Sequence, residues 1–223
     1  MTSVTIVVPV LNRPDHAALF VASARFATLG MPVGIVAVTE NRTDFDAWRA
    51  TGERLLYAKD RHTFAEKCNH AAGWISSDWL FFTGDDVRFQ CGWLEEALRV
   101  ADETGAMVVG TNDLGNPHVM AGDRGTHCLV NRRYIMERGA SGDGPGTAFS
   151  EAYKHCCDVE LVEVAKARGV WAHAHDSIVE HCHPTWGKGE MDATYAEGMS
   201  HQVADWRTWK KREQRVLAWA KDT

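Results

Sequence analysis

Short apolar runs alternate with longer segments of mixed polarity along the first half of the chain. The apolar runs are rich in β-branched or aromatic residues, which is typical of buried strands. We predict strands over 4–10, 33–38, 80–82 and 106–109. The segments between them predict helices over 16–29, 64–74 and 92–103. Strands that alternate with helices favour an α/β fold with a largely parallel sheet.

The pattern changes in the second half of the chain. Four glycines and one proline within 139–147 exclude regular structure there and predict a mobile loop. The remaining predictions are a helix over 160–168, one or two short strands over 170–179, a loop over 187–198 and a terminal helix over 205–221. The sequence contains no internal repeat and no low-complexity tract.

Composition places the chain among soluble globular proteins. It has 223 residues, of which 45% are hydrophobic and 24% charged. No run of about 18 apolar residues exists, so we expect no membrane span. The first residues lack a basic region, which indicates a first strand rather than a signal peptide. Six cysteines without a C-x-x-C pair favour free thiols in a reducing cytoplasm over a zinc ribbon or disulfides.

Polar residues follow three of the predicted early strands. Asp85 and Asp86 come after the third strand, Asn12 and Arg13 after the first, and Glu40 after the second. In open α/β sheets, ligands bind outside the carboxyl ends of the strands, and paired carboxylates suit a divalent cation that holds phosphate oxygens. The alternatives are turn residues, a solvated acid at 40 and a surface cation at 13. The sequence lacks the glycine-rich motifs of dinucleotide enzymes and P-loop NTPases.

Two later clusters carry further candidate chemistry. Asp158 stands where a helix begins, so it is either a helix-capping acid or a general base. His181 and His183 lie two residues apart on a predicted strand and share one face, which permits a metal site. His173 and His175 repeat that spacing. The alternative is that these histidines are surface or hydrogen-bonded core residues.

The order of these motifs resembles that of the GT-A family of nucleotide-sugar glycosyltransferases, most of all its family 2 inverting type. The resemblance covers roughly 4–198 and implies a Rossmann-like, mostly parallel sheet flanked by helices, in a single domain with a C-terminal helix. It implies a glycosyltransferase domain over 1–198, with a nucleotide-sugar-binding half at 1–110 and an acceptor and catalytic half at 111–198. A helical extension over 199–223 follows.

The resemblance assigns a metal site and a base. The Gly84-Asp85-Asp86 triplet resembles the D-x-D-type metal motif with Gly in its first place, so Asp86 would be the metal ligand. Asp85 would reach the ribose, or the metal through water. Asp158 matches the catalytic base of the Glu-Asp motif, with Cys157 replacing the Glu. The late histidine motif implies a second metal ligand, for which His181 is the better candidate and His183 the alternative.

The resemblance also assigns the donor pocket and the reaction. The residues implied in binding the nucleotide sugar are Pro9, Asn12, Arg13, Glu40, Lys67, Asn69, Asp85 and Lys188. The implied enzyme is a hexosyltransferase-type glycosyltransferase that uses a nucleotide-diphosphate sugar, UDP-sugar first, with Mn²⁺ or Mg²⁺ as cofactor. The cation would bind the donor diphosphate while Asp158 deprotonates the acceptor hydroxyl, which inverts the anomeric centre.

The acceptor depends on the terminal helix. The chain has a net charge of −6, but 205–221 holds six basic and two acidic residues, a net +4 that leaves −10 elsewhere. A helical wheel places an apolar stripe through Trp206 and Trp209. The opposite face gathers Arg207, Lys211, Arg212, Arg215 and Trp219. This face is either simply solvated or a surface for a polyanion.

If the basic face of the terminal helix binds a polyanion, DNA is one candidate for that polyanion. The small chain with its H-x-H-P and W-G-K motifs resembles phage-encoded members, so a hydroxymethylated base in DNA is one candidate acceptor and the host cytoplasm the implied location. A glycan, a protein or a lipid-linked sugar is the rival acceptor, and the missing membrane anchor disfavours the last. The alternative from another class is a non-catalytic module that binds a nucleotide or a metal. A sugar nucleotidyltransferase is disfavoured because the chain lacks its Gly-rich N-terminal loop.

Overall fold

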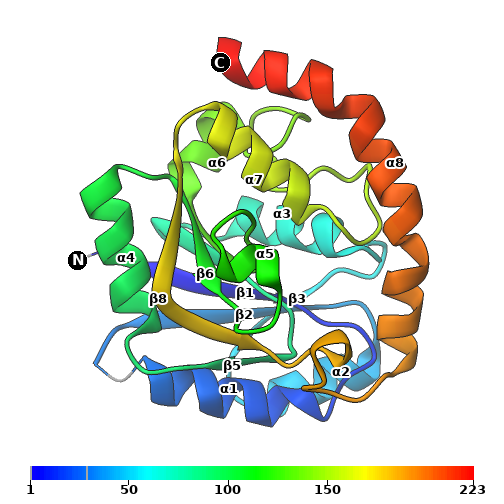
Figure 1. The fold of residues 1–223 in the computed structure, drawn as a ribbon. Helices are drawn as coiled ribbons and strands as arrows, with labels where there is room; N and C mark the ends of the chain where they lie inside the picture. The colour runs from blue at the N-terminus through cyan, green and yellow to red at the C-terminus, as the bar shows by residue number, and fades with distance from the viewer. Residues whose placement is uncertain (1, 29) are drawn as a thin grey trace.

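The first strand, β1 (Val4–Pro9), is an interior strand of the sheet, is buried along nearly its whole length and pairs with a parallel strand on each side. In the computed structural model, which describes residues 2–28 and 30–223, eight strands form one sheet in the order β3-β2-β1-β4-β7-β6-β8-β5. The other strands are β2 (Val33–Thr39), β3 (Arg54–Tyr57), β4 (Trp79–Phe82), β5 (Val87–Phe89), β6 (Val108–Asn112), β7 (Cys128–Asn131) and β8 (Trp171–His181). Figure 1 shows the strongly twisted sheet between two groups of helices.

Strand direction changes once the sheet passes β4. Strands β3, β2, β1 and β4 run parallel, whereas β7 is antiparallel to both β4 and β6. Strand β8 is parallel to β6, and β5 pairs antiparallel with β8. The carboxyl ends of β1 and β4 therefore meet at one edge of the sheet, where a ligand site is expected.

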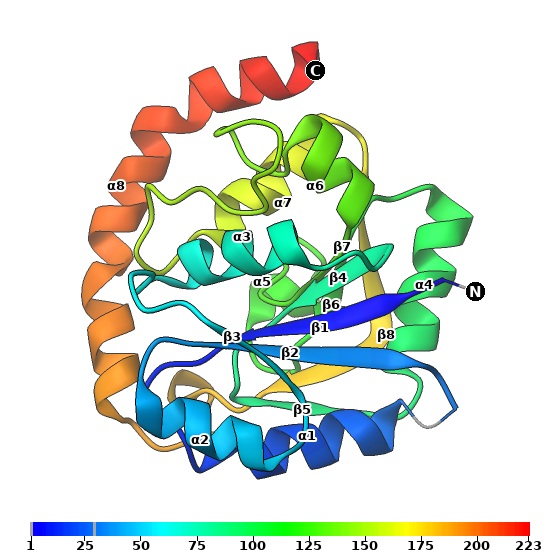
Figure 2. The same ribbon diagram turned by 180° about the vertical axis from the view of Figure 1, so that it is seen from behind.

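Alternate side chains of β1 point into two apolar cores, because successive residues of a strand face opposite sides. Val7 joins the core under α3 (Phe64–Trp74), α6 (Arg132–Arg138) and α7 (Asp158–Ala167). Ile6 and Val8 join the core under α1 (His16–Ala27), α2 (Arg42–Ala50) and α4 (Trp93–Thr104). Figure 2 shows α1 and α2 on one side of the sheet and α3, α6 and α7 on the other. The short helices α5 (Pro117–Met120) and η1 (Pro184–Trp186) lie in loops.

The last element, α8 (Ala193–Asp222), is a helix of 30 residues that runs along the outside of the molecule (Figures 1 and 2). Its second half packs on α7 through Trp209, Val216 and Ala220, all of which are buried. Its first half contributes to the wall of a cavity instead. No helix in the described ranges is long and apolar enough to cross a membrane.

The structure confirms the predicted α/β fold with a mostly parallel sheet and a C-terminal helix. The predicted early strands and helices are present within a few residues, although Leu29, at the end of the first predicted helix, lies outside the described residues. Region 139–147 contains no helix or strand, as expected. The segment 170–179 belongs to one strand, β8, which continues to His181. Strands β3, β5 and β7, helices α2 and α6 and the short helices α5 and η1 had no equivalent among the predicted elements.

The predicted loop over 187–198 is wrong in its second half. Helix α8 begins at Ala193 because the Asp192 side chain accepts a hydrogen bond from Tyr195 N and caps the helix. Gly198, which the sequence analysis took as a loop residue, lies within the helix. A Cβ at that position would sit 2.8 Å from the His155 ring, so glycine permits a close approach there. The expected domain boundary between 198 and 199 also falls inside α8.

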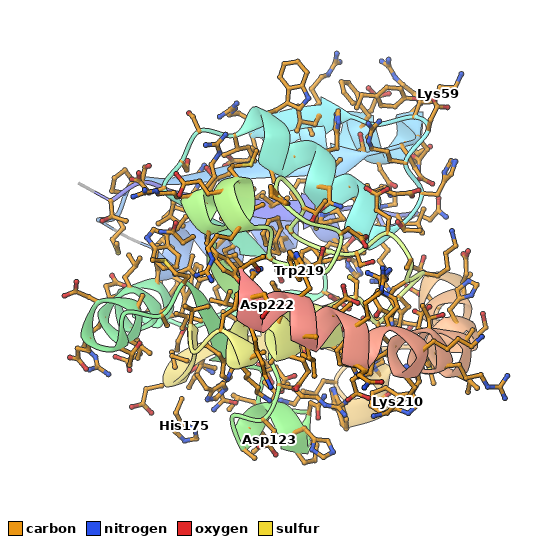
Figure 3. All side chains as sticks on the ribbon, turned by 90° about the horizontal axis from the view of Figure 1, so that it is seen from above. Lys59, Asp123, His175, Lys210, Trp219 and Asp222 are labelled. Carbon is orange, nitrogen blue, oxygen red and sulfur yellow. The ribbon has the colours of Figure 1, made fainter. Side chains whose placement is uncertain are left out.

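The predicted basic face of α8 is narrower than the helical wheel suggested. Arg212 points inward, where it donates hydrogen bonds to both oxygens of the fully buried Glu160 at 3.0 Å and to Asp143 at 2.6 Å. The Trp219 ring lies under the Arg168 guanidinium, 4.4 Å from its centre. Figure 3 shows Lys210 and Trp219 on opposite sides of α8. Only Arg207, Lys211 and Arg215 of the predicted face remain exposed.

We expect Arg212→Gln to destabilise the protein by about 3 kcal/mol, because it leaves the buried Glu160 carboxylate without its charge partner. The matched control is Lys211→Gln, an equal charge change at the next, exposed position. Urea unfolding at pH 7 measures the difference. Equal unfolding midpoints for the two variants would show that the ion pair contributes nothing.

Candidate active site

A cavity of about 950 Å³ opens at the carboxyl ends of β1 and β4, against the first half of α8. Strand β1 ends at Pro9, and the chain then turns so that Arg13 reaches the cavity. Strand β4 ends at Phe82, and Asp85 and Asp86 follow after one short turn. The expected edge of the sheet therefore carries a large cleft.

Asp86 is the most heavily contacted acid in this cavity. Its Oδ2 atom accepts a hydrogen bond from the Tyr195 hydroxyl at 2.6 Å and lies 3.2 Å from His181 Nε2. Burial opposes ionisation of this carboxyl group, but the bonds from His181 and Tyr195 and the charge of Arg13 outweigh it, and the pKa of Asp86 falls well below its usual range. Asp86 is therefore a carboxylate at any physiological pH.

The pKa of Asp85 shifts in the opposite direction to that of Asp86. Burial and the neighbouring Asp86 charge raise the pKa of Asp85 above its usual value, although His16 and Arg13 oppose that rise. Its Oδ1 atom receives a hydrogen bond from Arg13 at 3.1 Å, and its Oδ2 atom is buried without a partner among the described residues. Two adjacent acids whose pKa values are driven apart are suited to different tasks.

Arg13 connects this acid pair to α8. Its Nε and Nη2 atoms donate to the two oxygens of Asp192 at 2.8 and 3.1 Å, and its guanidinium lies 3.9 Å from the centre of the Tyr195 ring. The helix that closes the cavity is thus held by the same side chain that neutralises Asp85 and Asp86.

The pair formed by Asp86 and His181 fits a divalent cation. Two neighbouring ligands of an octahedral ion with bonds of about 2.1 Å are about 3 Å apart, and Asp86 Oδ2 and His181 Nε2 are 3.2 Å apart. Across residues 2–28 and 30–223, no three His, Cys, Asp or Glu side chains are placed to hold one ion. A cation held here would draw its other ligands from water or a substrate. His183 is engaged elsewhere, because its Nδ1 accepts a hydrogen bond from Thr185 N.

His127 is a site residue that the sequence analysis missed. It is buried, it lines the cavity, and its ring packs edge-on against His181 with centres 4.8 Å apart. The Thr83 hydroxyl donates to the Gly84 carbonyl, so its oxygen is free to accept from His127 Nδ1 at 3.2 Å. Burial lowers the pKa of His127 to about 3, which keeps the ring neutral. It lies just before β7, and no sequence signal marks it.

Tyr195 was also missed, because its segment was predicted to be a loop. The cap at Asp192 is the signal that identifies the helix start and places Tyr195 on the first turn.

Asp158 is the first residue of α7 and lines the same cavity. Burial raises its pKa to about 6, although backbone amides and the charge of Arg124 oppose that rise. The preceding residue, Cys157, occupies the cap position, so Asp158 is not the cap of this helix. A partly protonated carboxyl group near neutral pH has the basicity of a general base.

The structure brings most of the predicted site residues into the cavity. Those that line it are Pro9, Arg13, Lys67, Asp85, Asp86, Asp158 and His181. Glu40 lies behind this wall, where one of its oxygens is 3.0 Å from Lys67 Nζ. Lys67 in turn donates to the Val10 carbonyl at 2.7 Å. Glu40 thus holds a cavity residue in place without lining the cavity itself.

Three other predicted donor-binding residues lie outside the cavity lining. Asn12 adopts a left-handed backbone conformation (φ 56°), and its backbone N–H donates to the buried Asp44. Asn69 fixes the loop at residues 148 and 149, because its Oδ1 accepts from both backbone N–H groups. Lys188 is paired with Glu180 at 2.7 Å and donates to the Leu114 carbonyl. In this arrangement, the Lys188 charge is paired with Glu180.

Comparisons with solved structures identify the fold. The mannosyltransferase PcManGT from Pyrobaculum calidifontis, in complex with GDP-Man and Mn²⁺, superposes with a TM-score of 0.64 at 16% identity over 83% of this chain and 58% of that one. S. aureus TarS 1-349 superposes with a TM-score of 0.60 at 14% identity, over 80% of this chain and 59% of that one. Glucosyl-3-phosphoglycerate synthase from Mycobacterium tuberculosis, with Mn²⁺, UDP and phosphoglyceric acid, gives 0.61 at 13% identity, over 91% and 76%.

The chain therefore has the GT-A fold that these glycosyltransferases share. It spans about three fifths of the length of the first two structures. No protein-family model matches the chain, and no curated protein matches its sequence. At these identities the likeness establishes the fold, and the chemistry must be argued from the cavity.

We expect Asp86→Asn to abolish the stabilisation of the protein by Mn²⁺ together with UDP. The change removes the carboxylate charge but keeps an oxygen for the Tyr195 hydroxyl. In the parent protein, ligand at 100 times its dissociation constant should add about 2.7 kcal/mol to the free energy of unfolding. Thermal unfolding with and without EDTA measures this effect, with Asp102→Asn on the exposed face of α4 as the control. A variant that keeps the Mn²⁺-dependent shift would exclude Asp86 as a ligand.

Proposed function

We propose that this protein transfers a sugar from a nucleotide-diphosphate sugar to an acceptor hydroxyl with inversion at the anomeric carbon. UDP-sugars are the first candidates for the donor. The observation that carries the proposal is the meeting of the Asp86–His181 pair and Asp158 on the walls of one cavity within a GT-A fold. Structures of similar fold contain GDP-Man with Mn²⁺, UDP-GlcNAc, or UDP with Mg²⁺. The residues of this cavity suit ligands of that class.

The donor half of the cavity contains acidic groups that can hold a metal ion and basic groups close to them. A negatively charged diphosphate can bind to such a site through the metal ion. Asp86 and His181 would hold a Mn²⁺ or Mg²⁺ ion, which supplies positive charge to the diphosphate oxygens and to the leaving group. Lys67 is nearly fully buried and lines the same cavity, where its Nζ donates a hydrogen bond to the carbonyl of Val10 just after β1. Arg13 keeps Asp85 and Asp86 together and so preserves the shape of the site.

The acceptor half of the cavity supplies the base. Asp158 takes the proton from the acceptor hydroxyl as the acceptor oxygen bonds to the anomeric carbon. The bond between that carbon and the diphosphate oxygen breaks in the same displacement, and its electron pair leaves with the nucleoside diphosphate. One displacement inverts the centre, and no covalent intermediate with the protein forms. The raised pKa of Asp158 makes it a stronger base than an exposed aspartate.

A hydroxymethylated base in DNA remains one candidate acceptor, alongside glycans and proteins. The exposed residues Arg207, Lys211 and Arg215 on α8 would have to carry the phosphate contacts, since Arg212 and Trp219 are engaged within the protein. The alternative of another class, a non-catalytic module, predicts donor binding without any product.

We expect Asp158→Asn to lower transfer, or the slow hydrolysis of donor by water, by about 10²–10⁴-fold while donor binding changes little, because the amide cannot accept a proton. A panel of UDP- and GDP-sugars with Mn²⁺ or Mg²⁺, followed by mass spectrometry, first identifies the donor that the parent consumes. Asp176→Asn, an exposed substitution on β8, is the control. A parent that binds donors and releases no product would favour the non-catalytic module, and an unimpaired variant would exclude Asp158 as the base.

The pH dependence follows from the same carboxyl group. Asp158 must be ionised to accept a proton, and its pKa is raised to about 6. We expect kcat/KM to be constant well above pH 6 and to fall about tenfold per pH unit well below it, as the fraction of ionised Asp158 declines. Initial rates between pH 5 and 8.5 measure this profile. A rate that stays constant down to pH 5, as an unperturbed carboxyl group with a pKa near 4 would give, would contradict the assignment.

A further inference from the structure

The side chain of Trp206 lies beside the proposed base. It projects from α8, is 44% exposed and lines the main cavity. A second cavity, of about 120 Å³, is bordered by the same residue. Arg124, Asp158 and Val159 also line both cavities, so the two spaces adjoin at Trp206 and Asp158. A ligand in contact with Trp206 therefore lies within reach of the proposed base.

The position of Trp206 relative to Asp158 is fixed by its neighbour in sequence. Asp205 is buried, and its carboxylate accepts hydrogen bonds from the backbone N–H groups of Lys154, His155 and Cys156 at 3.1, 2.7 and 2.9 Å. The loop held in this way leads directly into α7 and Asp158. Trp209, one turn further along α8, is buried. The backbone that carries the indole is thus held in place before any ligand binds, which lowers the entropic cost of binding.

Two cations on the wall of the main cavity have no salt-bridge partner among the described residues, and one of them lies beside this indole. Arg124 lies with its guanidinium carbon 5.8 Å from the ring centre, and Lys154 lines the same cavity from the loop that Asp205 holds. In the part of the chain that the structure describes, no carboxylate lies within ion-pair distance of either side chain. Lys210, the other cation near the ring, is by contrast paired with Glu213 at 2.8 Å. Arg124 thus places an unpaired positive charge beside Trp206, and Lys154 adds a second on the wall of the same cavity.

We propose that Trp206, Arg124 and Lys154 form the acceptor subsite, and that the acceptor is a small phosphorylated molecule with a ring. The ring would lie on the exposed indole, and the phosphate would take the planar donor array of Arg124 and the ammonium of Lys154. The doubly negative charge of a phosphate monoester matches two unpaired cations better than a single carboxylate does. This inference rests on the proposed transferase function and specifies its acceptor.

Calorimetric titration of matched sugars tests the subsite. The probes are glucose and glucose 6-phosphate, then ribose and ribose 5-phosphate, each added to the protein saturated with Mn²⁺ and UDP. We expect the phosphorylated member of at least one pair to bind about tenfold tighter or more, because hydrogen bonds between oppositely charged groups are stronger than those between neutral groups. Arg124→Gln should remove most of that preference. Trp206→Leu should weaken both members of the pair by similar factors. Arg133→Gln, on the exposed surface of α6, is the matched control and should change nothing.

The outcomes separate this inference from the function on which it rests. A parent that binds no UDP in the presence of Mn²⁺ contradicts the proposed function itself. A parent that binds UDP but shows no phosphate preference in either pair overturns the acceptor subsite alone, as does an Arg124→Gln variant with an unchanged preference. Binding of a hydroxymethylated DNA duplex that weakens in Arg207→Gln but not in Arg124→Gln would also overturn it, and would assign the acceptor to the exposed face of α8.

Discussion

The site depends on the need to compensate two adjacent buried carboxylates. Asp85 and Asp86 follow β4 at the mouth of the cavity, and each is less than a tenth exposed. The Arg13 guanidinium forms ion pairs with both carboxylates. It donates its remaining hydrogen bonds to Asp192 at the start of α8. The cost of burying like charges is thereby met by a contact that also closes the cavity with a helix. The same Arg13 contacts therefore set both the charge balance and the shape of the site.

Helix α8 joins the two halves of the cavity. Its first turn places the Tyr195 hydroxyl on Asp86, and three turns later Asp205 holds the loop that leads to Asp158. Arg212 then anchors the far end on the buried Glu160. Because a helix is stiff, these contacts fix the distance between the proposed metal ligand and the proposed base. The C-terminal helix is part of the site rather than an appendage to a finished domain.

The sequence was sufficient for features that depend on local order and insufficient for those that depend on distant partners. Asp85, Asp86 and Asp158 could be predicted because each stands where an apolar strand ends or a helix begins. His127 and Tyr195 could not, because they meet His181 and Asp86 only through the sheet order and the path of α8. The helical wheel correctly placed Arg212 and Trp219 on one face of α8. It could not show that Arg212 is hydrogen-bonded to Glu160 and that Trp219 packs against Arg168.

The contact between Arg13 and Asp192 also has a consequence for the order in which the molecule forms. The two residues are 179 positions apart in the chain, and Tyr195 is 109 positions from Asp86. Contacts of such long range form late, because the entropy of closing so large a loop opposes them until most of the chain has condensed. Strands β1 and β4 and the acid pair precede α8 by more than 100 residues in the chain. The contacts that complete the cavity are therefore among the late events of folding, and Asp86 gains Tyr195 as a partner only after most of the sheet has assembled.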